Sequence, residues 1–238
     1  MKKQILILAL LFATTLSFAQ SPKPAQAQTN WRERYEQVGD FKEGFAKVLL
    51  NQKWGFVNET GTVVVPCKYD GAANFHEGFA TIELGEKSGF VDKTGRETIP
   101  CKYDLVGNFQ EGLALVQLDG KIGFVDKTGK EVISCQYQIA GGFNQVFAFI
   151  VLDEKWGFID KTGAIAIPCK YGYAGDFAEG LAPVQLDYLW GFIDKTGATI
   201  IPFKYDRAEV FSDGTAEVTL NSKLFYIDKK GNCVKNCP

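Results

Sequence analysis

Residues 156–163 read Trp-Gly-Phe-Ile-Asp-Lys-Thr-Gly, and near copies of these eight residues recur along the chain at a fixed interval. Self-similarity at a period of roughly 20–50 residues is the signature of a repeat architecture. Neighbouring copies start 34 residues apart, which predicts a row of small units sharing one elongated core. The other five copies start at Trp54, Ser88, Ile122, Trp190 and Leu224.

Each unit is predicted to be a three-stranded antiparallel meander, as the unit that starts at Phe75 illustrates. Residues 80–84 alternate apolar and polar side chains, which is the period of a half-buried strand, and residues 89–91 form the second strand. An Asp-Lys-Thr-Gly turn over 92–95 then leads into a third strand over 97–103. The Asp accepts a backbone N–H there, and the Gly relieves the strain of a left-handed residue.

Proline placement predicts the order of strands within a unit. Proline cannot donate a hydrogen bond, so it belongs at edges, strand ends or bulges. The Trp-Gly-Phe strand contains none and is predicted to lie centrally, whereas hydrogen bonding is not expected to run unbroken between units. Units are instead expected to contact each other through the aromatic residues of the Phe-x-Glu-Gly, Pro-Cys-Lys-Tyr and Trp-Gly-Phe segments. The prolines that share one position of the third strand are Pro66, Pro100, Pro168 and Pro202.

The predicted fold class is all-β, with six tandem 34-residue repeats of three-stranded meanders forming an open curved array. Nothing in the units requires closure. A closed, six-unit propeller-like ring is the alternative, because residues 35–238 make 204 residues, which is six times 34. The last copy reads Leu-Phe-Tyr at 224–226, and such deviations are expected in a terminal unit that lacks one neighbour.

The first 30 residues are predicted to lie outside the repeats, which occupy residues 31–238. Lys2 and Lys3 precede an apolar run and then small residues, the pattern of a secretory signal peptide over residues 1–19. Residues 20–30 are polar, carry two prolines and are predicted to form a flexible linker. The apolar run is too short to span a bilayer. We therefore expect an exported protein, located in the periplasm, at the cell surface or outside the cell.

Composition narrows the choice of partners. The chain is 46% hydrophobic and 23% charged, with a formal charge of −2. Removal of residues 1–19, with two lysines and no acids, leaves 24 basic and 28 acidic residues, a charge of −4. This weak acidic balance gives no electrostatic reason to expect nucleic acid or an anionic membrane as partner. One Met and one His leave little metal or proton-shuttle chemistry.

The repeat signature resembles a known bacterial family. Residues 155–163, together with Pro-Cys-Lys-Tyr at 168–171 and Phe-Ala-Glu-Gly-Leu-Ala at 177–182, are similar to the WG repeat, also called KWG. The resemblance runs from about Tyr35 to the C-terminus in six copies of one phase. It implies a β-rich protein without an established general activity, in a family likened to cell-wall-binding hairpin repeats.

The candidate ligand-binding residues are the repeat tryptophans Trp54, Trp156 and Trp190. An indole face offers broad apolar contact to a sugar ring and some cation–π capacity. The interpretation favoured by the sequence is packing between neighbouring units. Ile122 and Leu224 at the same repeat position fit such packing, whereas Ser88 suits an exposed position.

Six cysteines in a chain predicted to be exported raise the question of disulfides. Four of them occupy one position of successive units, which should lie about 10 Å or more apart, beyond the roughly 7 Å that a disulfide allows between Cα atoms. Phe203 takes this position in the fifth unit, which indicates a buried apolar site. The four cysteines are therefore predicted to be buried thiols. Cys233 and Cys237 are a candidate disulfide, although four residues along a straight strand would hold them apart. The four cysteines in question are Cys67, Cys101, Cys135 and Cys169.

The repeated acidic residues are predicted to stabilise turns. One carboxylate per turn falls far short of the six to eight oxygens that Ca²⁺ takes, and catalysis needs unlike groups converging on one substrate. No catalytic residue, metal site or cofactor is therefore predicted, and His76 is interpreted as a solvated loop residue. The turn residues are Asp92, Asp126, Asp160, Asp194 and Asp228, and likewise Glu43, Glu77, Glu111 and Glu179.

Three functional hypotheses follow from the sequence. The first is a non-catalytic binding or scaffold module of the cell envelope or exterior that contacts a protein partner across the broad face of the array. The second is the binding of an envelope polysaccharide through the three repeat tryptophans. The third is an unrecognised hydrolase with a site assembled from several units at the axis of a closed ring.

Overall fold

The computed structural model describes residues 30–237. The predicted signal peptide over residues 1–19 and all but the last residue of the predicted linker lie outside the described residues. Within residues 30–237 the chain is all-β apart from one short 3-10 helix, η1 (Trp31–Arg34). No helix among these residues is long and apolar enough to cross a membrane.

Six antiparallel sheets follow one another along the described chain, one for each repeat. The first contains β1 (Gln37–Val38), β2 (Phe45–Leu50), β3 (Lys53–Asn58) and β4 (Val63–Tyr69). The second contains β5 (Gly71–Ala72), β6 (Phe79–Leu84), β7 (Lys87–Asp92) and β8 (Glu97–Tyr103). The third contains β9 (Leu105–Gln110), β10 (Leu113–Leu118), β11 (Lys121–Asp126) and β12 (Glu131–Tyr137).

The three remaining sheets continue the same order of strands. The fourth has three strands: β13 (Ala148–Leu152), β14 (Lys155–Ile159) and β15 (Ile165–Tyr171). The fifth contains β16 (Tyr173–Ala174), β17 (Leu181–Leu186), β18 (Leu189–Asp194) and β19 (Thr199–Tyr205). The sixth contains β20 (Arg207–Ala208), β21 (Thr215–Leu220), β22 (Lys223–Asp228) and β23 (Cys233–Lys235).

The predicted three-stranded antiparallel meander is confirmed, since every unit contains these three strands. Five units add a further strand at one edge of the sheet, within the segment predicted to be a loop, and four of these strands have only two residues. In the fourth unit a single bridge between Ala140 and Ile150 takes its place. A two-residue strand has no room to show an alternating pattern, so the sequence does not reveal it.

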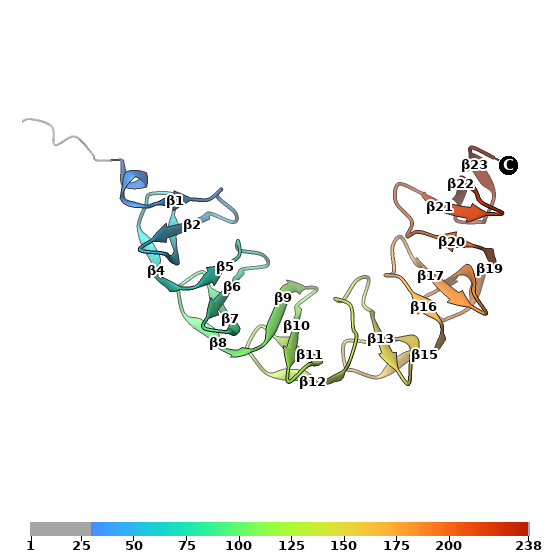
Figure 1. Ribbon diagram of the computed structural model, residues 1–238, viewed down its shortest axis with the longest axis horizontal. Helices are drawn as coiled ribbons and strands as arrows, with labels where there is room; N and C mark the ends of the chain where they lie inside the picture. Colours follow the sequence, from blue (N-terminus) through green and yellow to red (C-terminus); the bar gives the residue numbers. More distant parts are fainter. Residues whose placement is uncertain (1–29, 238) are drawn as a thin grey trace, which may run out of the picture.

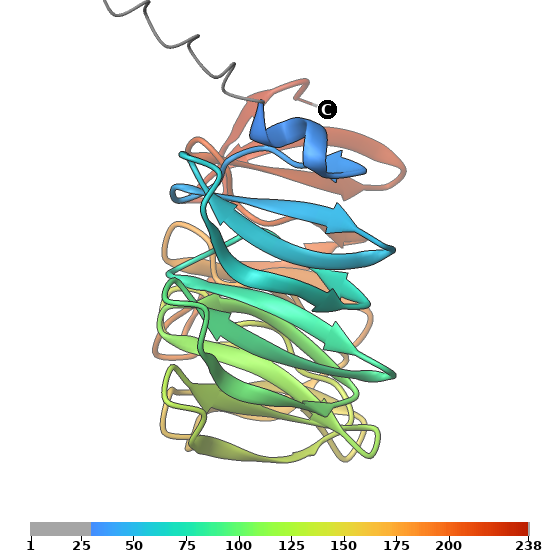
Figure 2. The same cartoon turned by 90° about the vertical axis from the view of Figure 1, so that its left-hand side faces the viewer.

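The six sheets are arranged as an open arc, which confirms the open curved array and not the closed ring. Figure 1 shows the first and last sheets at opposite ends of the arc, and no strand of one pairs with a strand of the other. The additional strands β1, β5, β9, β16 and β20 line the inner, concave side, and the last strand of each sheet lies on the outer side. Figure 2 shows the sheets stacked along the arc.

Side chains, and not backbone pairing, join neighbouring units, as predicted. Phe109 of the third unit is 1% exposed and lies between two rings of the second unit, 4.8 Å from Phe79 and 4.9 Å from Phe90, measured between ring centroids. Tyr103 of the second unit belongs to the same buried cluster. Equivalent Phe pairs join the other units: Phe56 with Phe75, Phe124 with Phe143, Phe158 with Phe177, and Phe192 with Phe211.

The Trp-Gly-Phe strand is central in each sheet, as the prolines predicted, and its glycine has a steric role. A Cβ added to Gly123 would lie 2.5 Å from the Ile133 carbonyl oxygen and 2.6 Å from the Cys135 nitrogen. The ladder between β11 and β12 shifts register at this point, and the strands cross more closely than side chains allow. Only glycine permits this approach.

The two ends of the arc differ from its interior. At the first unit, Trp31 packs edge-on against Tyr35 and Phe41, and all three contact the buried cluster of that unit. At the last unit, Thr215 takes the position that Phe or Leu occupies in the other five units, next to Glu217 on the same face of β21. A polar outer face at the end of a repeat array is the usual way to keep it from recruiting another unit.

Candidate functional site

The structure brings two of the three candidate tryptophans together. Trp156 (β14) and Trp190 (β18) flank Tyr173 (β16), with ring centroids 4.2 Å and 5.4 Å from the tyrosine ring. Phe149 (β13) extends the row, 5.1 Å from Trp156. Trp54 lies in the first unit, where the Lys47 Nζ atom is 4.8 Å from its ring centroid.

Packing and exposure are combined at these tryptophans. Trp156 packs against the buried cluster around Phe158, and Trp190 against the cluster around Phe192, yet both are only partly buried. Ser88 at the same repeat position is 8% exposed, so the expectation that it suits an exposed position was wrong. The position lies at the boundary between units, where one ring face packs and the rest reaches the surface.

A cleft of about 430 Å³ opens beside these aromatic residues, between the fifth and sixth units. It lies along the inner strands β16 and β20, on the concave side of the arc (Figure 1). Rings of three different strands form its apolar wall, and three charged residues complete it. The residues that matter for its chemistry are Phe149, Tyr173 and Trp190 in the wall, with Asp176, Arg207 and Glu209.

The charged groups of the cleft differ in how they are paired. The Arg207 guanidinium donates to one Glu209 carboxylate oxygen from two nitrogens, at 2.7 and 2.9 Å. The Asp176 carboxylate has no hydrogen-bond or ion-pair partner among residues 30–237, and its side chain is half-buried. Loss of hydration on burial raises the pKa of Asp176. Asp176 is therefore the charged group in the cleft whose interactions are least satisfied.

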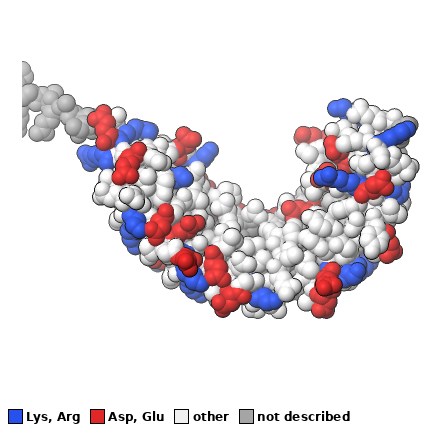
Figure 3. All heavy atoms as spheres, viewed as in Figure 1, with Lys and Arg blue, Asp and Glu red and all other residues white. Residues whose placement is uncertain are grey.

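The middle of the concave face is apolar. Leu105, Ile139 and Tyr173 follow one another at the 34-residue spacing on the inner side of the arc, and are 51%, 45% and 46% exposed. Figure 3 shows that the inner edge at the middle of the arc is largely free of charged side chains, which gather on the outer side and the two arms. The aromatic cleft adjoins this row, since Tyr173 belongs to both.

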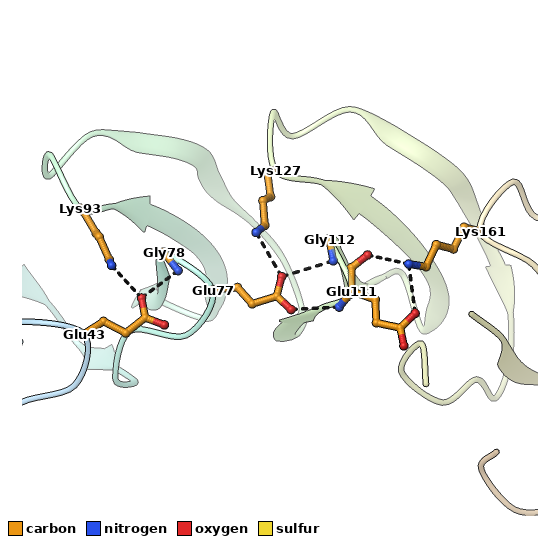
Figure 4. Close-up of polar contacts among 8 residues, drawn as sticks. All are labelled: Glu43, Glu77, Gly78, Lys93, Glu111, Gly112, Lys127 and Lys161. Carbon is orange, nitrogen blue, oxygen red and sulfur yellow. Dashed lines mark hydrogen bonds and ion pairs between the residues drawn. The ribbon is translucent and has the colours of Figure 1, made fainter. Parts of the chain in front are cut away.

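The turn glutamates also connect neighbouring units, a role that was not predicted from the sequence. Figure 4 shows that the glutamate of one unit contacts the next unit: Glu77 accepts hydrogen bonds from the Glu111 and Gly112 N–H groups at 3.0 and 3.3 Å, and pairs with Lys127 at 3.1 Å. Glutamate and lysine stand 50 residues apart in each such clamp, a spacing visible in the sequence. The four clamps are Glu43–Lys93, Glu77–Lys127, Glu111–Lys161 and Glu179–Lys229.

The fourth unit carries Gln145 instead, which accepts a hydrogen bond from the Gly180 N–H at 2.9 Å and forms no ion pair with Lys195 among the described residues. Gln145→Glu is therefore expected to add about 0.5 kcal/mol to the free energy of unfolding, and Glu77→Gln to remove a similar amount, as exposed ion pairs do. Urea denaturation at pH 7 measures both, with Glu59→Gln at an exposed turn as control. Equal effects at Glu77 and Glu59 would contradict the clamp.

These clamps also predict how stability depends on pH. Hydrogen bonding to Lys93 holds the pKa of the Glu43 carboxyl below its usual value, and Lys229 does the same for Glu179. A carboxyl whose pKa is lowered in the folded state stabilises the fold above its unfolded pKa of about 4.3 and loses that contribution as the pH falls through the folded value. The urea concentration at the midpoint of unfolding is expected to decrease as the pH is lowered below about 4.5. This decrease is expected to be less steep in the Glu43→Gln variant.

The cysteines divide as the sequence suggested, with one difference. The four repeat cysteines carry free thiols but are half-buried and not buried, because they lie on the outermost strands of their sheets. Burial raises the pKa of the Cys101 thiol, whose sulfur lies 3.7 Å from the Ile82 carbonyl oxygen. The structure joins Cys233 and Cys237 in a disulfide with a Cα separation of 5.6 Å. The chain turns after β23, where Asn236 has a φ of 54°, and does not continue straight.

The repeated aspartates cap their own turns. In the third unit the Asp126 carboxylate accepts hydrogen bonds from the Thr128 N–H at 2.8 Å and from the Lys130 N–H at 3.1 Å. Gly129 of the same turn has a φ of 87°, the left-handed conformation predicted for it. The carboxylate is thus engaged by backbone groups of its own turn, as the turn-capping interpretation predicts.

Comparison with solved structures shows a likeness of fold alone. The chain is similar to a structure titled as the eukaryotic initiation factor, with 14% identity, a TM-score of 0.53, and coverage of 87% of this chain and 64% of that one. For Hsv2 of Kluyvelomyces marxianus the values are 10%, 0.47, 81% and 76%, and for Hsv2p of Kluyveromyces lactis 8%, 0.46, 81% and 74%. No curated protein matches the chain.

Comparison with protein families gives a direct result. The family described as the WG containing repeat matches six consecutive segments, 34–54, 54–87, 89–121, 122–156, 156–190 and 190–223. The last five segments each run from the central strand of one sheet to the central strand of the next, and the six together cover most of the chain. The chain therefore belongs to the WG repeat family.

Proposed function

We propose that the protein is an exported, non-catalytic binding module that holds a protein partner along the concave face of the arc. The observation that carries this proposal is the row of half-exposed apolar side chains at Leu105, Ile139 and Tyr173. A face on which several apolar side chains are exposed is a candidate interaction surface. The signal-peptide pattern of residues 1–19 supports a location in the envelope or outside the cell.

The geometry of the arc suits a protein partner better than a small molecule. The inner strands present their side chains on a curved surface that spans several units, so a partner of matching shape can bury many of them at once (Figure 1). Aromatic residues and arginine are enriched at the centres of protein interfaces. Tyr173, Trp190 and Arg207 lie together at one end of the apolar row.

Tyr173→Ala is expected to reduce recovery of the native partner by about tenfold or more, because an aromatic anchor residue of an interface commonly contributes more than about 1.4 kcal/mol. The test is co-purification of the tagged protein from the envelope fraction, followed by quantitative mass spectrometry. Ile165→Ala is the matched control, since Ile165 is 53% exposed on the outer strand β15. Equal recovery with Tyr173→Ala and the wild type would refute the concave face as the docking surface.

The aromatic row supports a second candidate, the binding of an envelope polysaccharide. Trp156, Tyr173 and Trp190 place three rings in succession, and sugar rings stack on such faces through their apolar C–H surfaces. Retention on a column of envelope glycan, lost in Trp156→Ala and unchanged in Trp54→Ala, would favour this candidate. Unchanged retention in Trp156→Ala would remove it.

Absence of catalysis is part of the proposal. Among the charged groups of the cleft, Arg207 and Glu209 are paired with each other. General acid–base catalysis needs a side chain that is free to give or take a proton at the reacting group, and Asp176 is the one charged group of the cleft without a partner among residues 30–237. Turnover on a broad panel of glycosides, esters and peptides, abolished by Asp176→Asn, would overturn this part of the proposal.

A further inference from the structure

The cleft between the fifth and sixth units combines an aromatic wall with an excess of negative charge. Phe149, Tyr173 and Trp190 supply rings from three strands, while Asp176 and Glu209 outnumber Arg207. Since Arg207 is held by Glu209, the Asp176 carboxylate is the charge left for a ligand to meet. Aromatic faces attract cations through their quadrupoles, most strongly where water is partly excluded.

The other units do not share this arrangement. The repeat position of Asp176 is occupied by Asn74, Asn108, Gly142 and Val210 elsewhere, and only the first unit has an aspartate, Asp40. Asp40 is exposed, whereas Asp176 is half-buried beside the aromatic wall. The two aspartates therefore share a repeat position but differ in burial and in neighbouring side chains, so Asp40 is a suitable control for Asp176.

An unpartnered, half-buried carboxylate is costly to the fold. Burial raises the pKa of Asp176, which means that its ionised form is less stable in the folded protein than in the unfolded chain. In the stretch described by the structure, no lysine, arginine or backbone N–H offsets this cost at the Asp176 oxygens. A charged side chain that lowers the stability of the fold and has no partner within it is characteristic of binding sites.

We infer that this cleft binds the guanidinium group of an arginine side chain presented by the protein partner, with Asp176 as its counter-ion and Tyr173 and Trp190 as stacking surfaces. Guanidinium suits the site because its planar, weakly hydrated group stacks on aromatic rings while its N–H groups pair with a carboxylate. A volume of about 430 Å³ accommodates an arginine side chain with neighbouring backbone. This inference deepens the proposed function and rests on it.

The inference is tested with two short peptides of equal shape. Acetyl-Ala-Arg-Ala-amide carries the guanidinium, and acetyl-Ala-citrulline-Ala-amide replaces it with a neutral urea. Binding is followed on the protein by two-dimensional NMR of the tryptophan indole N–H signals, of which the sequence allows four. The signal that disappears in Trp190→Phe identifies Trp190. The arginine peptide is expected to shift the Trp190 signal saturably. The citrulline peptide is expected to bind with about tenfold lower affinity.

Two substitutions separate binding from stability. Asp176→Asn is expected to weaken binding of the arginine peptide by about tenfold or more, because a charge-assisted hydrogen bond is lost, and Asp40→Asn to leave it unchanged. In the absence of peptide, Asp176→Asn is expected to keep or raise the melting temperature, since it removes a half-buried charge that has no partner among the described residues. A residue with a purely structural role would lower it.

Three results would overturn the inference: no saturable shift of Trp190, equal binding of the two peptides, or an Asp176→Asn protein that binds like the wild type. Tighter binding of spermidine than of the arginine peptide would also overturn it, by making a free polyamine the better ligand. These outcomes leave the proposed function standing, because the Tyr173→Ala co-purification decides that separately. A loss of partner in Tyr173→Ala with no peptide binding would mean that the partner docks without arginine in this cleft.

Discussion

Phe109→Ala is expected to lower the free energy of unfolding by about 3–5 kcal/mol, the usual cost of removing a fully buried phenylalanine. Phe109 lies between Phe79 and Phe90 of the preceding unit, so the substitution opens a cavity at the junction of two units. No hydrogen-bonded strands cross this junction, so the buried rings hold the two sheets in register together with partly exposed polar contacts such as the Glu77–Lys127 clamp. The measurement is urea denaturation followed by tryptophan fluorescence and circular dichroism.

Leu105→Ala is the matched control for that substitution. Leu105 lies on the same strand, β9, but is 51% exposed, and its truncation is expected to change stability by less than about 0.5 kcal/mol. If the aromatic contacts join the units, Phe109→Ala also separates the array into two halves that unfold at different urea concentrations. A loss below about 1 kcal/mol with a single transition would contradict this account of how the units are joined.

Gly123→Ala is expected to cost about 3 kcal/mol, at the upper end of the cost of overpacking. The added Cβ would meet backbone atoms of Ile133 and Cys135 at 2.5 and 2.6 Å, and backbone cannot rotate away as a side chain can. β11 is held on both sides, by β10 and by β12, which leaves it no direction in which to move.

Gly107→Ala is the control for this prediction. Gly107 lies on β9, and its added Cβ would be 3.6 Å from the nearest atom, the Leu115 Cβ, an ordinary contact. In thermal unfolding, Gly123→Ala is therefore expected to lower the melting temperature. Gly107→Ala is expected to leave it nearly unchanged or to raise it slightly. Similar melting temperatures would show that the close crossing of the strands is not needed for the fold.

The three strands of the meander could be predicted because their sequence pattern lies within one unit and recurs in six copies. Alternation over residues 80–84, the capped turn over 92–95 and the prolines of the third strand each point to the same meander. Four of the inner strands escaped prediction because two residues carry no period, as at Gly71–Ala72, and the six-residue β9 because its sequence does not alternate apolar and polar residues. The half-burial of Cys101 escaped it because the outer position of the third strand depends on the curvature of the whole arc.

The candidate site could be predicted only in part. Trp156 and Trp190 stood out by type and phase, but their relation to Tyr173 depends on which residues neighbouring units bring together. Asp176 occupies a position where other units have unrelated residues, so no repeated pattern marks it. The glutamate clamps could have been found, because Glu77 and Lys127 recur together at a spacing of 50 residues and Gln145 marks the exception.

Docking of the partner on the concave face can be tested by photo-crosslinking in the cells that produce the protein. A benzoylphenylalanine probe is placed at Ile139 or Tyr173 on the inner side, and at Ile165 or Ile200 on the outer strands, four positions that are 45%, 46%, 53% and 44% exposed. The account predicts partner adducts from the two inner positions and none from the outer two. Adducts from Ile165 and Ile200, with none from Ile139 and Tyr173, would contradict it.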